Sequence, residues 1–373
     1  MKQGTRKKDK GLRVEPLPVA AAEFSTRLLR WYGREGRELP WRNTRDPYRI
    51  WLAEIMLQQT TVRAVIDYYR AFLDRFPTLE ALAAATVEEV IDHWAGLGYY
   101  SRARNLHKTA RRVVTEFFGA FPSDVETLQT LPGVGRSTAG AISALAFEQR
   151  APILDGNVRR VLCRLCALEE PPRSPMAEKQ LWAWAEELTP EADVHDYTQA
   201  IMDLGATICT PRSPLCEQCP VVELCQARAH GLGQVLALKQ AKKEVPSRSE
   251  LTLVITHAGR FLVRRRPAEG FLGGLWEFPN IPLGIDADSE RQLGFYLQEH
   301  GVGAQLLAVG SVKHLYSHFR LDARVYRLDV DDLPRISEGD WCWISLPELT
   351  TLALHGAHKK VLELIQSSES KDA

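Results

Sequence analysis

The stretch LPGVGRSTAGAISALAF, residues 131–147, joins a glycine-containing turn to a helical segment. Gly133 and Gly135 permit positive φ and the close approach of another backbone. The segment after them predicts a helix whose first N–H groups lack intrahelical partners and can hold an anion. The motif alone leaves two interpretations open. It is either a tight turn between helices or a binding site for a backbone phosphate group, which does not depend on the identity of the bases.

Helical periodicity extends in both directions from this turn. Apolar residues recur at three- and four-residue spacing over residues 22–205, as in EFSTRLLRWY and ARNLHKTARRVVTEFF. Prolines and glycines separate the successive helices. Thr86 with Glu89 predicts a helix start of the capping-box type.

The pattern changes to strands after residue 249. LTLVITHAGRFLVRRR predicts two strands joined by a turn at 257–260, and LWEFP, AQLLAVG, FRLDARVYRLDV and DWCWIS predict further strands. SERQLGFYLQEHG and KKVLELIQ predict helices. A helical domain followed by a smaller α+β domain is therefore expected. The predicted segments are a basic disordered tail at 1–21, a helical domain at 22–228, a linker at 229–248, the α+β domain at 249–366 and a tail at 367–373.

Composition sets only broad limits. The chain of 373 residues is too long for a single ordinary hydrophobic core, which favours two domains. Its net charge is zero, so the overall charge gives no support to nucleic-acid binding. No apolar run is long enough for a membrane span. The start MKQGTRKKDKGLR is basic but lacks the apolar segment of a secretory signal, which favours the cytoplasm. This start predicts a disordered tail or, alternatively, a weak DNA-contacting arm.

Four of the seven cysteines lie within seventeen residues, as Cys209-x6-Cys216-x2-Cys219-x5-Cys225. An odd total in a reducing compartment argues against a disulfide framework. Four thiolates at this spacing suit zinc or an iron–sulfur cluster, and the spacing does not choose between them. Cys163 and Cys166 resemble a redox pair, but they lie on the apolar helix VRRVLCRLCAL, where core packing is the better interpretation.

Two carboxylates are candidates for catalysis. Glu54 lies in IWLAEIMLQQTT, where Gln58 shares its helical stripe. Asp155 lies in APILDGNVRRVL, between an apolar run and a helix. Taken alone, Glu54 is more simply a solvated helix residue and Asp155 more simply an N-cap.

Six motifs occur in order along the chain, namely LPWR, AEIMLQQT, GLGYYSRARNLHK, LPGVGR, GRSTAGA and ILDGNVRRV. Together with the cysteine spacing they closely resemble the MutY adenine DNA glycosylases of the helix-hairpin-helix superfamily. The resemblance runs from about residue 22 to 366, and the part up to Cys225 is shared with endonuclease III-type enzymes. It implies a multidomain fold: an all-α glycosylase domain with its helix-hairpin-helix at about 124–147 and a cluster loop at 209–225, followed by an α+β Nudix-like domain.

The resemblance also implies the ligands and partners. Cys209, Cys216, Cys219 and Cys225 would bind one 4Fe–4S cluster. The substrate would be double-stranded DNA with adenine opposite 8-oxoguanine or guanine, bound by a monomer in the bacterial cytoplasm with no membrane association. The residues that would anchor the DNA backbone are Leu131, Gly133, Val134, Gly135 and Arg136.

Matching to the family assigns the catalytic roles. After the adenine is flipped out of the duplex, Glu54 would protonate it at N7 as a general acid of raised pKa. Asp155 would stabilise the oxocarbenium-like sugar, and Asn157 would orient the site. Glycosylases that also cut the strand carry a lysine where this chain has Ser137, so an efficient lyase step is not expected.

The remaining matched positions would contact the substrate. Those assigned to the adenine pocket are Arg37, Leu39, Trp41, Arg42 and Gln199, and those that fill the gap and touch the opposite strand are Gln58, Gln59 and Thr60. Tyr99 would be a wedge beside 8-oxoguanine. Without the family, Trp41 and Tyr99 would be interpreted as core aromatics.

The second domain would recognise 8-oxoguanine. The family's reader is Phe-Ser-His, and the chain has Tyr316, Ser317 and His318, so the first position departs from the pattern. SERQLGFYLQEHG lacks the glutamate cluster that a hydrolytic Nudix helix needs for magnesium. Three alternatives remain: a bifunctional endonuclease III-like glycosylase and lyase, a non-enzymatic iron–sulfur DNA-binding protein, and a pyrophosphatase activity of the second domain.

Overall fold

The computed structural model describes residues 14–233, 235–236, 245–267, 270–284, 289–299, 306–316, 318–331 and 341–372. The chain divides into two compact units. The first comprises Met1–Ala84 and Asn105–Ala241, and the second comprises Ala85–Arg104 and Lys242–Ala373. The multidomain architecture predicted from sequence is confirmed, although the second unit also includes the segment Ala85–Arg104, which the predicted boundaries assign to the helical domain.

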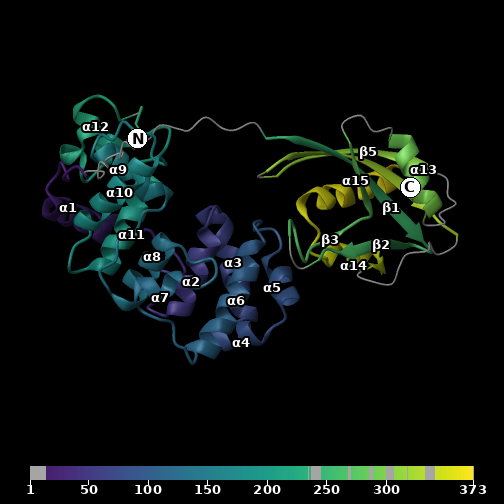
Figure 1. Cartoon of the computed structure of the whole chain (residues 1–373), viewed down its shortest axis with the longest axis horizontal. Coiled ribbons are helices and arrows are strands. Elements are labelled where there is room, and N and C mark those ends of the chain that lie inside the picture. The colour runs from purple at the N-terminus through teal and green to yellow at the C-terminus, as the bar shows by residue number, and fades with distance from the viewer. Residues whose placement is uncertain are drawn as a thin grey trace, which may run out of the picture. The chain divides into compact units, whose positions relative to one another are not determined.

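The first unit is built from helices (Figure 1). They are α1 (Ala21–Glu35), α2 (Pro47–Leu57), α3 (Val62–Arg75), α4 (Leu79–Ala84), α7 (Val125–Gln129), α8 (Arg136–Phe147), α9 (Gly156–Leu165), α10 (Pro175–Leu188), α11 (Val194–Asp203) and α12 (Gln226–Ala229). A π-helical turn, η1 (Leu204–Ile208), continues α11, and two short 3₁₀ turns, η2 (Cys216–Gln218) and η3 (Val222–Leu224), lie in the cysteine loop. Helix α5 (Val87–Trp94) belongs to the second unit, and α6 (Ser101–Glu116) begins there.

The apolar stripes of these helices form a continuous core. Phe24 of α1, Leu162 of α9 and Ala200 of α11 are fully buried in one cluster. Cys163 and Cys166 also belong to that cluster, which confirms their interpretation as packing residues. None of the helices among the described residues has the length and apolar character needed to cross a membrane.

Part of the predicted N-terminal tail is ordered. Residues 1–13 lie outside the described residues, but residues 14–20 pack against the helical unit. The backbone N–H of Glu15 donates to Gln180 Oε1 (2.7 Å), and the carbonyl of Glu15 accepts from Trp184 Nε1 (3.1 Å). Leu17 and Val19 are partly buried against the helical core. In the structure this part of the predicted tail contacts the helical unit, because these two apolar residues pack on a surface that only the folded unit provides.

The second unit contains a seven-stranded sheet. Its strands are β1 (Ser247–His257), β2 (Arg260–Arg265), β3 (Trp276–Glu277), β4 (Asn280–Leu283), β5 (Leu306–Leu315), β6 (Arg320–Asp329) and β7 (Trp341–Ser345). The main order is β3-β2-β1-β6-β5, with β4 paired to β1 and β7 to β2. The β1–β6 pair is parallel and the others are antiparallel. The predicted β1–β2 turn is confirmed, with Ala258 and Gly259 both at positive φ.

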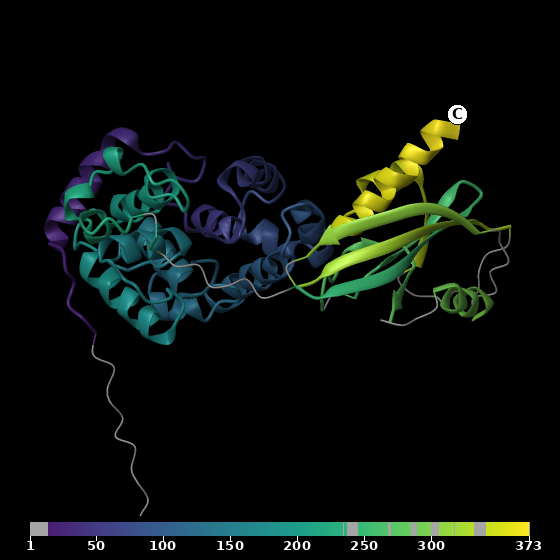
Figure 2. The ribbon, with the colours of Figure 1, turned by 90° about the horizontal axis from the view of Figure 1, so that it is seen from above.

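Helices cover both faces of this sheet (Figure 2). Val254 of β1 joins one core with Leu349 of α14 (Leu346–Thr351) and Val361 of α15 (Gly356–Asp372). Leu253 of β1 points the other way and joins a core with Leu293 of α13 (Ser289–Glu299). Because successive side chains of a strand alternate in direction, neighbouring residues of β1 serve opposite faces. Helix α15 continues through the predicted tail at 367–373 as far as Asp372, and the predicted linker 229–248 lies partly outside the described residues.

Candidate active site

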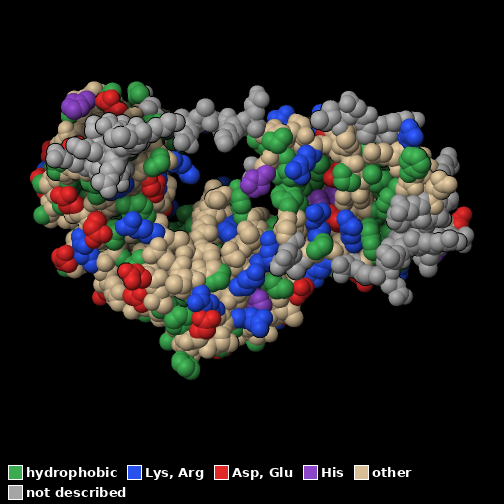
Figure 3. Space-filling model, viewed as in Figure 1, with side chains coloured by type: hydrophobic (Ala, Val, Ile, Leu, Met, Phe, Trp, Pro, Cys, Tyr) green, Lys and Arg blue, Asp and Glu red, His purple; other side chains and the backbone are tan. Residues whose placement is uncertain are grey.

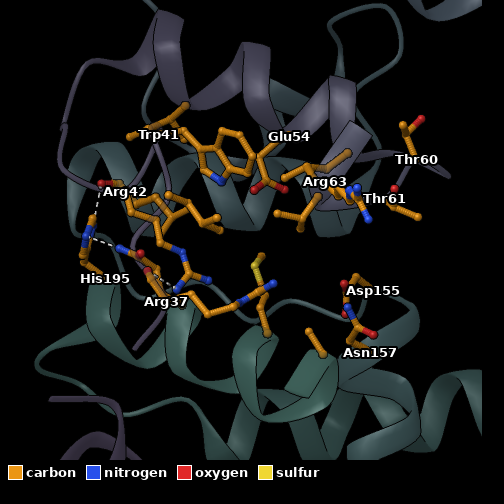
Figure 4. Close-up of a pocket in the computed structure, with 18 residues that line it drawn as sticks. Arg37, Trp41, Arg42, Glu54, Thr60, Thr61, Arg63, Asp155, Asn157 and His195 are labelled. Atoms are coloured by element: carbon orange, nitrogen blue, oxygen red, sulfur yellow. Dashed lines mark hydrogen bonds between the residues drawn. The ribbon is translucent and has the colours of Figure 1, made fainter. Parts of the chain in front are cut away.

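A cavity of about 530 Å³ opens in the helical unit. Figure 4 shows the side chains that line it. The cavity brings together most of the predicted catalytic and adenine-pocket residues: Arg37, Leu39, Trp41, Arg42, Glu54, Thr60, Asp155, Asn157 and Gln199. Residues spread over more than 160 positions of sequence thus meet at one site, which no local pattern guarantees.

Glu54 projects into this cavity from α2. The Asp46 side chain caps the start of that helix by accepting from the N–H of Tyr48 (2.9 Å), and Pro47 occupies the first turn. The neighbours of Glu54 on the helix are buried, and Glu54 itself is half-buried. Burial raises the pKa of Glu54 to about 7, the negative charge of Asp155 adds to the rise, and Arg42 opposes it. The interpretation of Glu54 as a solvated helix residue is therefore wrong.

Asp155 faces Glu54 from the opposite wall of the cavity (Figure 4). Its Oδ1 accepts from the N–H of Val158 (2.7 Å), so Asp155 is also the N-cap of α9. For Asp155, capping of α9 and a catalytic role are compatible, because the carboxylate has a second oxygen and several lone pairs. Burial raises the pKa of Asp155, and hydrogen bonds from the N–H groups of Val158 and Asn157 oppose that rise.

Asn157 is held by a close backbone approach and by Arg160. A Cβ on Gly205 of η1 would lie 2.6 Å from the Cβ of Asn157, so only glycine fits there. Arg160 donates to Asn157 Oδ1 (2.9 Å) and to the carbonyls of Gly205 (2.6 Å) and Cys209 (2.7 Å). One guanidinium thus connects the cavity wall, a π-helical turn and the first cysteine of the cysteine loop.

Asp203 is a member of the site that sequence reasoning missed. Its carboxylate is fully buried beneath the cavity and accepts from Arg42 through two bonds of 2.5 Å. Arg37 donates to it from Nε (2.6 Å) and from its backbone N–H (3.0 Å). Burial alone would raise the pKa of Asp203, but the hydrogen bonds from Arg42 and then Arg37 outweigh it and lower the pKa. These bonds hold both pocket arginines in place, and the single carboxylate offsets part of their positive charge.

Among the lining residues that were not predicted, two carry titratable side chains, Arg63 and His195. His195 Nδ1 lies 2.9 Å from the carbonyl of Leu145, and its Nε2 contacts the Gln199 amide. Gln199 Oε1 also accepts from the Tyr32 hydroxyl (2.9 Å), which fixes the orientation of this predicted adenine-pocket amide. Arg63, from α3, is exposed on the opposite side (Figure 4).

The predicted hairpin lies between α7 and α8. Gly133 adopts φ 80°, whereas Gly135 has φ −85° and caps α8 without a side-chain hydrogen bond. Leu131 and Val134 are buried, so these two side chains hold the turn in place while Gly133, Gly135 and Arg136 remain exposed. Gln58 lies outside the cavity and donates to the carbonyl of Gly133 (3.3 Å), joining the end of α2 to the turn.

Ser137 occupies the first turn of α8. Its Oγ accepts from the backbone N–H of Leu154 (3.0 Å), the residue before Asp155. The hydroxyl of Ser137 is therefore engaged with the segment that carries Asp155.

The four predicted cysteine ligands, Cys209, Cys216, Cys219 and Cys225, line one small cavity. Arg164 donates to Cys209 Sγ (3.3 Å) and to the carbonyl of Thr210 (2.7 Å). Among the described residues no three His, Cys, Asp or Glu side chains are close enough to hold a single metal ion.

A second cavity, of about 440 Å³, lies in the second unit. Tyr99, Tyr316 and His318 all line it, so three of the predicted 8-oxoguanine contacts meet there. Ser317 lies outside the described residues. Tyr99 has φ 50° and Gln59 has φ 59°, conformations that non-glycine residues rarely adopt and that often mark functional positions.

Parts of the protein surface are positively charged, although the net charge of the chain is zero. Lys and Arg side chains gather over α6 (Figure 3). Lys108 and Arg111 of that helix are exposed, whereas Arg112 pairs with Glu116 (2.7 Å). Local basic surfaces of this kind can bind phosphate in a protein without net charge.

Comparison with known proteins gives consistent matches. The model for HhH-GPD superfamily base excision DNA repair proteins matches residues 52–187, that for the iron-sulfur binding domain of endonuclease III matches 209–225, and that for the NUDIX domain matches 251–364. The adenine DNA glycosylase of Homo sapiens is 38% identical over 406 residues, covering 93% of this chain and 74% of the human protein. That of Buchnera aphidicola subsp. Schizaphis graminum is 32% identical over 348 residues, covering 92% of this chain and 99% of the relative. The solved structure of a thermostable thymine-DNA glycosylase is 32% identical with a TM-score of 0.52, covering 56% of this chain and 97% of that one.

Proposed function

Since this chain belongs to the adenine DNA glycosylase family of base excision repair enzymes, we propose that its substrate is adenine mispaired with 8-oxoguanine or guanine in double-stranded DNA. The observation that carries the proposal is the pair Glu54 and Asp155, which face each other across a cavity of about 530 Å³. A base inside a duplex cannot reach such a cavity, so the adenosine is flipped out of the stack.

Glu54 acts as the general acid. Its pKa of about 7 leaves a large share of the carboxyl protonated near neutral pH. The carboxyl donates its proton to N7 of adenine as the bond between C1′ and N9 breaks, and the bonding electrons leave with the base. Adenine then departs neutral rather than as an anion, which lowers the barrier.

Asp155 stabilises the positive charge that develops on the sugar. It lies on the wall opposite Glu54, so acid and carboxylate can act on opposite sides of the scissile bond (Figure 4). Asn157 helps to orient the sugar and the water. The water attacks C1′, its proton passes to the Glu54 carboxylate, and the products are free adenine and an abasic site.

Base removal proceeds without an efficient lyase step. Ser137 has no amine with which to form a Schiff base, and its hydroxyl accepts from Leu154 N–H (3.0 Å). We assign it a structural part in holding the segment that carries Asp155.

Cys209, Cys216, Cys219 and Cys225 hold one 4Fe–4S cluster. The match to an iron–sulfur binding domain over residues 209–225 and the shared cavity of the four thiols support this assignment. The cluster supplies structural cross-linking of the loop. Arg160 and Arg164 donate to carbonyls of that loop, and Arg160 also reaches Asn157, so the ordered loop supports the cavity wall.

Recognition of the opposite base is the task of the second unit. Tyr99, Tyr316 and His318 supply aromatic and polar surface around a cavity of about 440 Å³. Aromatic faces stack on an unstacked base, and a polar group is needed to tell 8-oxoguanine from guanine.

The proposal predicts a specific order of substrates. Excess enzyme is mixed with duplexes that carry adenine opposite 8-oxoguanine, guanine or thymine, and strand breaks are counted before and after alkali. We expect breaks only after alkali, fastest opposite 8-oxoguanine and absent opposite thymine. Breaks without alkali would reveal a lyase nucleophile, and equal rates on all three duplexes would contradict the proposed selectivity.

A further inference from the structure

A buried polar cluster lies behind Tyr316 in the second unit. Glu277 is 0% exposed, His355 3% and His358 0%. Arg264 Nε donates to Glu277 Oε1 (2.6 Å), and Arg266 pairs with the other carboxylate oxygen. Burying such a cluster costs free energy unless its members satisfy one another.

The proton positions in this cluster follow from the charges. Burial opposes ionisation of Glu277, but His355, Arg266 and Arg264 outweigh it and lower its pKa, so Glu277 is an anion. Burial, followed by the proximity of His358, lowers the pKa of His355 to about 4, so this imidazole is neutral near pH 7.

The neutral imidazole of His355 has one donor and one acceptor nitrogen. Its Nε2 lies 3.8 Å from Glu277 Oε2, which is beyond hydrogen-bond distance, but the negative charge of the carboxylate favours the tautomer with the proton on Nε2. Nδ1 is then the acceptor. Because Nδ1 lies 2.9 Å from the Tyr316 hydroxyl, Tyr316 is the donor of that bond.

This bond is one of two polar contacts of the Tyr316 hydroxyl, since the backbone N–H of Ala357 also hydrogen-bonds to it, and aromatic packing holds the ring. Tyr316 contacts the rings of His314 (4.4 Å between centroids), Phe319 (5.0 Å) and Phe271 (5.2 Å). Its ring also lines the second cavity. Phenylalanine, the residue that the family pattern expects at this position, would fit the packing but would leave His355 Nδ1 without its donor.

We propose that His355, oriented by Glu277, is a positioning residue that fixes the Tyr316 ring through its hydroxyl and thereby sets the preference for 8-oxoguanine over guanine opposite the excised base. The inference rests on the proposed function, because it assigns a supporting residue to the same recognition surface. The inference also explains why tyrosine stands where the family pattern has phenylalanine, because the hydroxyl of Tyr316 and the imidazole of His355 act together.

The test measures binding without base removal. Full-length protein is titrated with duplexes that carry a tetrahydrofuran abasic analogue opposite 8-oxoguanine or opposite guanine, and the ratio of the two Kd values is the readout. Tyr316→Phe and His355→Leu are each expected to reduce this ratio by about 2- to 10-fold, the worth of one hydrogen bond. The double variant is expected to lose no more than Tyr316→Phe alone, since Tyr316→Phe already removes the bond that His355→Leu removes.

Two matched variants separate positioning from general damage. His355→Asn keeps an acceptor near the place of Nδ1 and is expected to retain more of the ratio than His355→Leu. Tyr326→Phe makes the same chemical change in the core on the other face of the sheet and is expected to leave the ratio unchanged. An unchanged ratio in Tyr316→Phe, or additive losses in the double variant, would overturn the proposal.

A spectroscopic readout covers the case in which wild-type protein shows no preference between the two duplexes. That result would count against the proposed recognition of 8-oxoguanine and would equally overturn the role of His355 in it. The hydrogen bond itself is checked by ¹⁵N spectra of the histidines, assigned with His355→Asn. We expect His355 as the Nε2–H tautomer, with an Nδ1 signal that moves in Tyr316→Phe, and a stationary signal would contradict the bond.

Discussion

Replacing Glu54 with Gln is expected to reduce single-turnover adenine release by roughly 10²- to 10⁴-fold, the usual worth of a general acid. Glutamine has nearly the same shape and can still donate a hydrogen bond, but it cannot transfer a proton to N7. Duplex binding should persist, because Glu54 lies at the wall of the cavity rather than on the exposed hairpin that we assign to the DNA backbone.

Glu54→Gln is also expected to change how the free energy of unfolding depends on pH. The pKa of Glu54 is raised in the folded state from 4.5 to about 7, so ionising it costs the fold free energy. The cost is absent below about pH 4.5, grows as pH rises towards 7 and is complete above it, reaching about 3 kcal/mol. Glu54→Gln should therefore unfold at higher urea concentration than wild type at pH 8 and lose this advantage at pH 5. Equal unfolding midpoints at both pH values would contradict the buried position of the carboxyl.

Replacing Asp203 with Asn is expected to destabilise the helical unit by about 3–5 kcal/mol, the cost of breaking one side of a buried ion pair. Asp203 is fully buried and Arg42 is only 8% exposed, so neither solvent nor another group compensates the lost charge. Because its pKa is lowered, the stabilisation by Asp203 is fully present above the ordinary pKa of an aspartate, and it is lost as pH falls below that value and through the lowered pKa. Urea unfolding at pH 7 measures the loss.

Glu148→Gln is the matched control for this variant. Glu148 pairs with Arg45 at 2.8 Å, but the two side chains are 63% and 50% exposed. Removing one charge of such a pair should change the free energy of unfolding by about 1 kcal/mol or less. Losses of similar size in Asp203→Asn and Glu148→Gln would show that Asp203 is not the buried clamp described above.

Local patterns predicted much of this molecule. The capping box at Thr86, the turn after β1 and the start of α9 at Asp155 each depend on neighbours within four residues, and all three are present. The family resemblance, the helical and Nudix-like domains and the iron–sulfur binding segment are confirmed by the comparisons. These features could be predicted from the sequence because each depends on a motif whose residues are contiguous.

The missed features depend on distant contacts. Asp203 looks like an ordinary polar residue at a helix end, and only folding brings Arg37 and Arg42 to it from more than 160 residues away. One signal could have found it: Asp203 is a lone acid in the otherwise apolar stretch AIMDLGATI, where an unpaired carboxylate would be costly. The same holds for Gly205, whose contact with Asn157 joins two segments far apart in sequence.

Backbone strain was also beyond the sequence. Glutamine and tyrosine have no preference for positive φ, yet Gln59 and Tyr99 both adopt it. Only the surrounding fold can enforce such conformations. It does so at eight non-glycine positions of the described chain, and Gln59 and Tyr99 are the two of them that were predicted to contact DNA.

The most direct test of the central claim, that Glu54 is the protonated acid of this site, is the pH dependence of kcat/KM for adenine release from a duplex with adenine opposite 8-oxoguanine. This constant reports the ionisation of groups in the free enzyme. The account predicts a fall in kcat/KM as pH rises through about 7, as Glu54 loses its proton. A kcat/KM that increases with pH, or that stays level up to pH 9, would contradict it.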